Sequence, residues 1–419
     1  MRMKFNKSSQ LILVSAGSLL AAMLVTACSQ ITQTLTVDFV FVASSKAAGP
    51  DDYGEINVFE INSESGRMRQ IPSSPFPSAG RDPVAEAVSA DYGSLFVANQ
   101  DDNNIVQFVI GTDGKLYPFN TVNTPGIYPL ALAANKSELF VLDTYQPLPI
   151  CSTADPCSGS LAVYPLTAPT KSEPAALQPP AVNPAIGAAY WPLALPGKTD
   201  VLVPTGVNVL ASGSYVYVTA YDSSVIPSVG YVFGFSVGTG GVLTPLTGSP
   251  FAAGTQPSAI GSDASSTYVY VTDYAKAQIL GYSVTASGSL SPLTSGAGGS
   301  NLFASGNEPS AIVVDPAYPY VYVANSLDGT VAAYSASNGA LTGLGTYTAG
   351  QQPVAIGVDP STERFLFTAN FLGNSTSGFQ LSTTAGTLVE SQFSPSPTND
   401  QPTAVAAIPH NGTGGGVEK

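Results

Sequence analysis

The 419-residue chain contains only 10% charged residues and has a formal net charge of −14. So acidic a chain repels nucleic acid and other anionic polymers, which excludes a nucleic-acid partner and leaves cations, sugars and neutral ligands; the acidity also serves solubility alone. Glycine (41 residues) and proline (34 residues) are abundant, as expected for many short strands joined by tight turns.

Residues 1–27 have the features of an export signal. Basic residues precede the apolar run LILVSAGSLLAAMLV, which is too short for a comfortable membrane span. The segment ends in Val-Thr-Ala-Cys, which resembles a bacterial lipobox, so Cys28 is expected to carry the lipid that anchors the protein to a membrane. Ser29 then resembles the pattern of outer-membrane lipoproteins, and 28–37 form a polar tether. The alternative is a plain secretory signal with an incidental cysteine.

The stretch 306–350 shows a repeating unit most clearly. It holds four short runs rich in β-branched and aromatic residues, SAIVVD, YVYVAN, TVAAYS and ALTGLGTY, separated by turn residues. This alternation predicts a meander of four antiparallel strands, here called a, b, c and d.

The run that forms strand b recurs seven times along the chain. Its copies are DFVFVAS at 38–44, LFVAN at 95–99, LFVLD at 139–143, YVYVTA at 215–220, YVYVTD at 268–273, YVYVAN at 320–325 and FLFTAN at 365–370. The runs that form strand a begin at a proline, namely Pro83, Pro129, Pro204, Pro257, Pro309, Pro353 and Pro402.

A four-strand unit that recurs at roughly 45 residues is typical of a β-propeller. We therefore predict an all-β fold over 38–410, a seven-bladed β-propeller of four-stranded antiparallel blades. The N-terminal blade lacks strand a, which QPTAVAAIP at 401–409 supplies. The C-terminal strand a is thus expected to pair with the N-terminal strands b–d and close the ring, which removes open sheet edges. The Gly-rich tail, 411–419, is expected to be disordered.

The repeated strand residues resemble the YVTN repeat, and the chain resembles the seven-bladed propellers of the lactonase-like family over about residues 35–410. That family includes 6-phosphogluconolactonase-type enzymes, so the resemblance implies the propeller fold. It also implies, as one possible function, a lactonase-type hydrolase. The matching residues belong to strands and turns, and they specify the fold rather than the activity.

Loop lengths distinguish the two faces of the predicted ring. The a–b and c–d turns are short, whereas the b–c and d–a connections on the opposite face, here called the upper face, hold the insertions. Two insertions fall in blade 3, at about 144–159 and 168–200. We expect them to form a lid or rim beside the central channel, and this lid contains Trp191. Cys151 and Cys157 bracket a short loop in the first; in an exported protein this favours a disulfide over a metal pair.

Polar residues recur where the strands meet the upper face. The b-strands end in Asn99, Asp143, Asp273, Asn325 and Asn370. The residues before the a-strands are Arg81, Asp82, Gln256, Glu308, Gln352 and Gln401. One interpretation is a funnel that binds a ligand or holds a divalent cation through oxygen atoms, without another cofactor. The other is that Asn and Asp only cap turns.

The sequence contains one histidine, His410, which excludes a Ser-His-Asp triad and a His-rich metal site. We expect a monomeric envelope protein whose upper face binds a protein, glycan or small molecule. The alternative is a lactonase acting on an extracytoplasmic lactone, with Arg81 stabilising the oxyanion and Glu308 or Asp82 as the base. A purely structural role is the third possibility.

Overall fold

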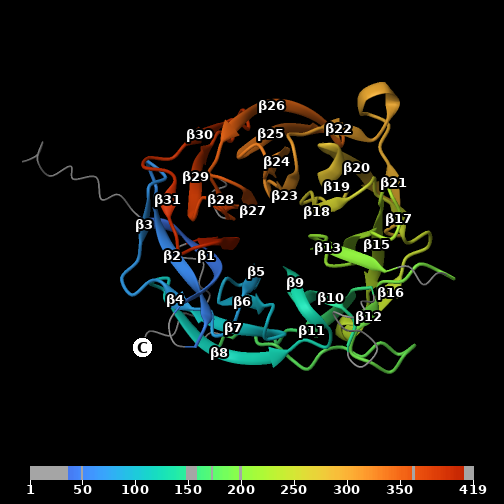
Figure 1. Cartoon of the computed structure of the whole chain (residues 1–419), viewed down its shortest axis with the longest axis horizontal. Helices are drawn as coiled ribbons and strands as arrows, with labels where there is room; N and C mark the ends of the chain where they lie inside the picture. Colours follow the sequence, from blue (N-terminus) through green and yellow to red (C-terminus); the bar gives the residue numbers. More distant parts are fainter. Residues whose placement is uncertain are drawn as a thin grey trace, which may run out of the picture. The chain divides into compact units, whose positions relative to one another are not determined.

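The structure, a computed structural model, describes residues 36–48, 51–147, 158–170, 173–197, 201–360 and 364–409. In these residues the strands form seven antiparallel sheets arranged in a ring (Figure 1). The predicted seven-bladed propeller is therefore confirmed. The predicted export signal, the lipidated Cys28, most of the tether, Cys151, Cys157, His410 and the tail lie outside the described residues.

The first three blades run from the N-terminus in chain order. Blade 1 contains β32 (Pro402–Pro409), β1 (Thr36–Ala48), β2 (Tyr53–Asn62) and β3 (Met68–Gln70), with the short β4 (Phe76–Pro77) beside β2. Blade 2 contains β5 (Pro83–Val88), β6 (Ser94–Asn99), β7 (Asn104–Ile110) and β8 (Leu116–Asn123). Blade 3 contains β9 (Ile127–Ala134), β10 (Glu138–Tyr145), β11 (Ser160–Pro165) and β12 (Trp191–Pro192).

The other four blades complete the ring. Blade 4 contains β13 (Leu202–Val209), β14 (Tyr215–Asp222), β15 (Val229–Val237), the 3₁₀ turn η1 (Thr239–Gly241), β16 (Leu243–Pro245) and β17 (Phe251–Ala252). Blade 5 contains β18 (Pro257–Ser262), β19 (Tyr268–Asp273), η2 (Tyr274–Lys276), β20 (Gln278–Val284), β21 (Leu290–Pro292), η3 (Ala297–Gly299) and β22 (Leu302–Ala304). Blade 6 contains β23 (Pro309–Val314), β24 (Tyr320–Asn325), β25 (Thr330–Ser337) and β26 (Ala340–Thr348). Blade 7 contains β27 (Pro353–Val358), β28 (Phe365–Asn370), β29 (Ser375–Leu381), β30 (Leu388–Glu390) and β31 (Ser396–Pro397).

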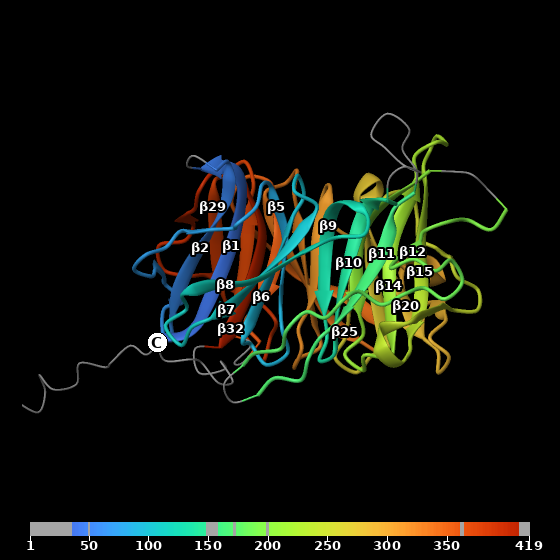
Figure 2. The same ribbon diagram turned by 90° about the horizontal axis from the view of Figure 1, so that it is seen from below.

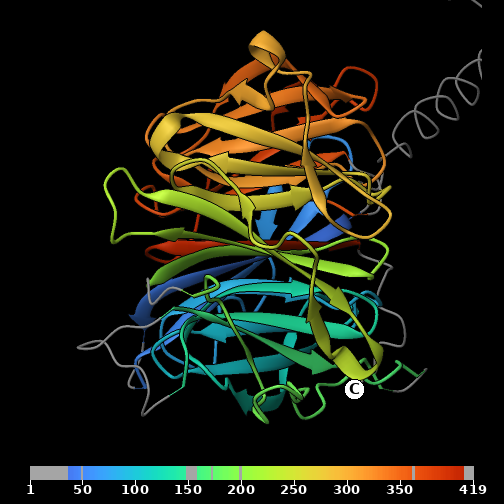
Figure 3. The same cartoon turned by 90° about the vertical axis from the view of Figure 1, so that its right-hand side faces the viewer.

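The b-strands form the buried layer of the fold. Every residue of β6, β24 and β28 is buried, as the near-continuous apolar runs in the sequence predict. Neighbouring blades lie face to face (Figure 3), and their b-strand side chains fill the seams between them. Burial of one such phenylalanine or valine contributes about 1.5–3 kcal/mol. Over the seven blades together, the repeated strand b contributes more buried apolar residues than strand a, c or d.

Each innermost strand carries the repeated proline at or near its start, followed by a bulge. Proline has no N–H to donate, which is tolerated where a strand begins at a sheet edge. The pairing of strands a and b shifts by one residue directly after this proline, as between Pro309 and Ala311. The preceding residue adopts left-handed φ in five blades, at Asp82, Tyr128, Glu308, Gln352 and Gln401. This turn leads the chain from the d–a connection into the innermost strand of the next blade. Figure 2 shows the blades from the side of the ring.

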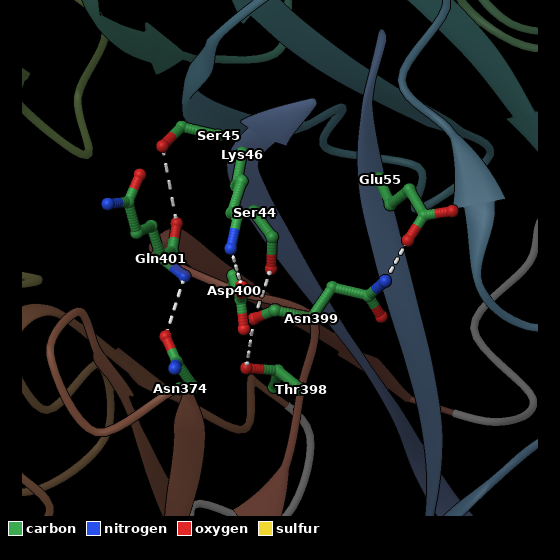
Figure 4. A network of polar contacts seen from close by, with 9 residues as sticks. All are labelled: Ser44, Ser45, Lys46, Glu55, Asn374, Thr398, Asn399, Asp400 and Gln401. Carbon is green, nitrogen blue, oxygen red and sulfur yellow. Dashed lines mark hydrogen bonds and ion pairs between the residues drawn. The ribbon is translucent and has the colours of Figure 1, made fainter. Parts of the chain in front are cut away.

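The C-terminal strand closes the ring as predicted. β32 pairs antiparallel with β1, with Phe39 opposite Ile408 and Val42 opposite Val405. Polar contacts reinforce this junction at the upper face (Figure 4), where Lys46 forms an ion pair with Asp400 and the backbone N–H of Gln401 donates to Asn374 Oδ1 at 2.9 Å. The last strand therefore belongs to the first blade in both backbone pairing and side-chain contacts.

Blade 3 departs from the prediction. The stretch after β11 is the c–d connection and leaves the blade at the lower face, because β12 forms only at Trp191. It fills the seam with blade 2, where Gln107 Nε2 donates to the carbonyl of Ala175 at 2.6 Å. Trp191 is only 3% exposed, and its Nε1–H donates to the Leu243 carbonyl at 3.0 Å. The predicted lid or rim of 144–159 and 168–200 is therefore wrong for the described residues 168–170 and 173–190, and Trp191 belongs to the core between blades 3 and 4. Most of the first insertion lies outside the described residues.

Candidate functional site

A cavity of about 560 Å³ opens on the upper face between blades 6 and 7. Its polar lining comes from the d–a connections and the b–c turns, and includes Glu308, Ser326, Asp328, Gln351 and Gln352. Two residues in this set, Glu308 and Gln352, precede inner strands and were predicted from the sequence. The other predicted polar residues do not line this cavity.

Hydrogen bonds hold the Glu308 side chain at the cavity wall. The Tyr274 hydroxyl donates to Glu308 Oε2 at 2.6 Å, and the Ser326 hydroxyl lies 3.4 Å from the same oxygen. The bond to Glu308 is the main cause of the raised pKa of Tyr274, so this phenol stays protonated and remains a donor. Since the Glu308 backbone is also held in left-handed φ, its carboxylate is positioned before any ligand arrives.

A second carboxylate, that of Asp328, lines the same cavity. Asp328, in the turn after β24, accepts the backbone N–H of Asn307 at 2.7 Å and the Asn307 side-chain amide at 2.9 Å. The turn tips carry two exposed leucines, Leu327 at 66% and Leu372 at 61%. The cavity is therefore rich in acceptors, with an apolar rim and without an arginine or lysine among its lining residues.

The five polar residues that end the b-strands are not accessible to a ligand. None of them exposes any surface: Asn99, Asp143, Asp273, Asn325 and Asn370. A glycine of the d–a connection covers each side chain, as Gly350 covers Asn370. Asp273 illustrates the role, because it accepts the backbone N–H groups of Thr255 at 2.9 Å and Gln256 at 3.1 Å. These residues anchor the d–a connections, as the turn-capping interpretation expected.

The expected partners Arg81 and Asp82 lie elsewhere on the ring. They belong to blade 2, which blades 7 and 1 separate from Glu308. Arg81 Nε donates to Asp102 Oδ1 at 2.7 Å, so a nearby carboxylate already neutralises its charge. Burial is the main cause of the raised pKa of Asp82. The proposed pairing of Arg81 with Glu308 at one reaction centre is therefore wrong.

The other two predicted glutamines have different environments. The backbone N–H of Gln256 donates to Asp273, and its carbonyl accepts the N–H of Tyr274 at 2.9 Å. Gln401 lies in the closure network at the junction of blades 7 and 1 (Figure 4). Only Gln352 of the three lines the cavity.

The sequence analysis did not predict that two carboxyl groups, those of Asp143 and Glu86, have raised pKa values. Burial raises the pKa of Asp143 to about 8. Burial also raises the pKa of Glu86 well above its ordinary value, and within the described residues its carboxyl oxygens have no hydrogen-bond partner. Glu86 occupies the register position that the other inner strands fill with aliphatic residues: Leu132, Val207, Ile260, Ile312, Ile356 and Val405. Burial thus favours the neutral form of both groups, and neither lines the cavity.

Sequence reasoning also missed Tyr274 and Asp328. The signal for Tyr274 was its position directly after the strand-b aspartate, in YVTDY. Across the described ranges, no group of three or more His, Cys, Asp or Glu side chains is placed to hold a metal ion. Nor does that part of the chain contain a helix long and apolar enough to cross a membrane.

Comparisons with known proteins agree with this geometry. The sequence model of the family described as "Lactonase, 7-bladed beta-propeller" matches residues 297–410, which include the cavity. No curated protein matches the chain.

Solved structures match over nearly the whole propeller. A putative 6-phosphogluconolactonase from Bacteroides fragilis has a TM-score of 0.67 and 17% identity, with 90% of this chain and 99% of that chain covered. One from Bacteroides uniformis has a TM-score of 0.66 and 16% identity, covering 89% and 100%. The periplasmic gluconolactonase of Pseudomonas aeruginosa has a TM-score of 0.66 and 16% identity, covering 89% and 99%. At this identity the likeness confirms the lactonase-like propeller fold and leaves the activity open.

Proposed function

We propose that this chain is a lipid-anchored protein of the bacterial cell envelope whose propeller binds a small hydroxyl-bearing ligand in the cavity between blades 6 and 7. The observation that carries the proposal is the pre-positioned Glu308, held by Tyr274 in a cavity of about 560 Å³. A cavity of this size suits a monosaccharide-sized molecule or part of a longer glycan.

The lining chemistry defines the charge of the ligand. Glu308 and Asp328 are acceptors, and the lining set contains no cationic side chain to balance them. A neutral or cationic sugar donates its hydroxyl or ammonium protons to these carboxylates, whereas a phosphorylated sugar is repelled. The family resemblance to 6-phosphogluconolactonase-type enzymes therefore does not extend to a phosphorylated ligand in this cavity.

Three related probes test this proposal. Titration calorimetry with D-glucosamine, D-glucose and D-glucose 6-phosphate is expected to give affinities that fall in that order. Glu308→Gln is expected to weaken glucosamine binding by about 10- to 100-fold, because a charged acceptor is lost. Gln256→Ala is the matched control, since Gln256 holds the equivalent position in blade 5 outside the cavity. Equal loss in both variants, or tightest binding of the phosphate, contradicts the proposal.

The lipid anchor rests on the sequence around Cys28 and has its own test. Expressed in a bacterium, the full chain is expected to incorporate radiolabelled fatty acid and to sediment with membranes. Cys28→Ser is expected to abolish the label and release the protein into the soluble fraction. Membrane association that persists without Cys28 argues against lipidation as the anchor.

A lactonase is the second candidate, favoured by the gluconolactonase fold neighbours together with the position of Glu308 at the cavity wall. In this case Glu308 acts as the base that activates water, and a neutral donor such as the Gln352 amide stabilises the oxyanion. Proton release from D-glucono-1,5-lactone, measured by pH-stat with and without divalent cations, tests it. Turnover that falls at least 100-fold in Glu308→Gln supports the enzyme. Sugar binding without turnover supports the binding module.

A further inference from the structure

A second cavity, of about 320 Å³, lies on the lower face between blades 5 and 6. The a–b turns of both blades and the c–d turn of blade 6 form its walls. It is therefore on the opposite side of the ring from Glu308. Aromatic and prolyl rings dominate its walls, with Tyr268, Tyr318, Pro316 and Pro319 among them.

The repeat shows that one tyrosine in this cavity lacks its usual bond. Tyr215, Tyr268 and Tyr320 begin the b-strands of three successive blades. The hydroxyl of Tyr215 donates to the Ala286 carbonyl at 3.0 Å, and that of Tyr320 to the Thr383 carbonyl at 3.4 Å, each in the next blade's c–d turn. Among the described residues, the Tyr268 hydroxyl has no such partner, so its donor and acceptor capacity stays available at the cavity.

A buried carboxyl group adds a second unused polar atom. Asp315 lines the cavity and is 2% exposed. Its Oδ1 accepts the backbone N–H groups of Ala317 and Tyr318, both at 2.9 Å. Its Oδ2 has no hydrogen-bond partner within the part of the chain that the structure describes. Leaving such an atom unpaired in the folded protein is costly, which favours a ligand that supplies the missing partner.

From these contacts we propose that the lower-face cavity is a second binding site, which takes a neutral saccharide. Tyrosine and proline rings offer flat apolar walls to the C–H face of a sugar ring. Tyr268, Asp315 and the Asn338 amide, which all line the cavity, offer hydrogen bonds to its hydroxyls. The carboxyl groups of Asp263 and Asp315 disfavour an anionic ligand.

Saturation-transfer NMR on the full chain tests the site with maltose and N-acetylglucosamine as probes. We expect a saturable signal that Tyr318→Ala weakens at least 10-fold and Tyr268→Phe at least fivefold. Tyr268→Phe keeps the ring and removes only the unpaired hydroxyl, so it tests the site without disturbing the fold. Tyr215→Phe is the matched control, because the hydroxyl of Tyr215 in blade 4 already donates to the Ala286 carbonyl in blade 5.

The outcomes separate this site from the upper one. In Glu308→Gln, the maltose signal that remains is expected to keep its sensitivity to Tyr268→Phe and Tyr318→Ala, since these tyrosines lie on the other face. The absence of a saturable signal with either sugar overturns the lower-face site, as does a signal insensitive to Tyr268→Phe and Tyr318→Ala. Displacement of the sugar by p-cresol at lower concentration also overturns it, because the cavity then selects an aromatic ring rather than a saccharide.

Discussion

At the scale of single residues, one register position shows how the repeat reuses a polar side chain. The strand-b residue that pairs with the repeated proline is asparagine in three blades and aspartate in two others. Asn370 Nδ2 donates to Ser375 Oγ at 3.2 Å on the neighbouring strand. In blade 3 the same place holds Asp143 opposite Ser160, whose hydroxyl has no partner among the described residues. The aspartate is thus the less suitable residue there.

Asp143→Asn is expected to stabilise the protein above neutral pH. The folded state holds the Asp143 proton up to about pH 8, whereas the unfolded chain releases it near its ordinary value. The stability that the neutral carboxyl contributes is therefore full at low pH and falls as pH rises toward 8, by up to about 1.4 kcal/mol per pH unit. Urea unfolding at pH 5, 7 and 9 should show a gain from Asp143→Asn that grows with pH.

Asp273→Asn is the matched control for that series. Asp273 accepts two backbone N–H groups and the Gln278 side-chain amide at 3.2 Å. In Asp273→Asn, the new side-chain NH₂ group would face these donors and could not accept their hydrogen bonds. This variant is expected to lose about 1–3 kcal/mol at every pH. A gain that is independent of pH in Asp143→Asn, or a gain in Asp273→Asn, contradicts the assignment.

The sequence predicted the chemical type of these side chains better than their accessibility. The strand ends and the residues before the inner strands were correctly placed at the upper face. Glycines of the d–a connections completely bury the polar residues at the ends of the b-strands. The sequence pattern of strand b gives no indication of this contact. Conversely, Tyr274 reaches Glu308 from the neighbouring blade, across a distance in sequence that no local pattern spans.

At the scale of the element, glycines in the c–d turns pack against aromatic rings of the neighbouring blade. Gly386 in blade 7 has φ +67° and packs against the ring of Tyr320 in blade 6. The same arrangement joins Gly339 to Tyr268, Gly288 to Tyr215, Gly114 to Phe39 and Gly66 to Phe365. A side chain at these turns would enter the aromatic ring, so only glycine satisfies both the backbone and the seam.

Gly386→Ala therefore has two costs, backbone strain and a clash with Tyr320. Gly240→Ala is the matched control, since Gly240 also lies in a c–d turn, with φ +69° and no atom within 4 Å of an added Cβ. We expect a loss of about 1 kcal/mol for Gly240→Ala and about 2–4 kcal/mol for Gly386→Ala, measured by urea unfolding. Equal losses in the two variants would show that the contact with Tyr320 adds nothing.

Strands with a clear sequence pattern could be predicted, whereas the outer strand of blade 3 could not. Its outer strand β12 is two residues long, too short to carry any periodicity. Its assignment depends on the packing of Trp191 against blade 4, a tertiary contact. Without that strand, the sequence offered no means of dividing 166–201 between a lower-face and an upper-face connection.

At the scale of the whole molecule, the closure of the ring decides whether seven blades form one folding unit. β32 supplies the innermost strand of blade 1 and also packs beside β5 and β27 in the neighbouring blades. The sequence repeats predicted this closure. Six copies of the four-strand unit were complete, and the seventh was divided between the two chain ends. Loss of β32 leaves an unpaired edge on β1 and removes Ile408 from the apolar cluster that contains Phe39 and Phe41.

A chain that ends at residue 401 is expected to aggregate or unfold non-cooperatively, because the ring stays open. A chain that ends at Pro409 is the control and keeps every closing pair. Light scattering coupled to size-exclusion chromatography should show a monomer for the control alone. A monomeric, cooperatively unfolding chain without 402–409 would contradict the role of the closure.

The central claim is that the upper-face cavity between blades 6 and 7 holds the ligand. Hydrogen-exchange mass spectrometry of the full chain, with and without D-glucosamine, tests it most directly because every blade is read at once. The account predicts slowed exchange confined to the segments around 305–310, 326–329 and 348–352. Protection that is absent from these segments, or that appears only in blades 2 to 4, would contradict it.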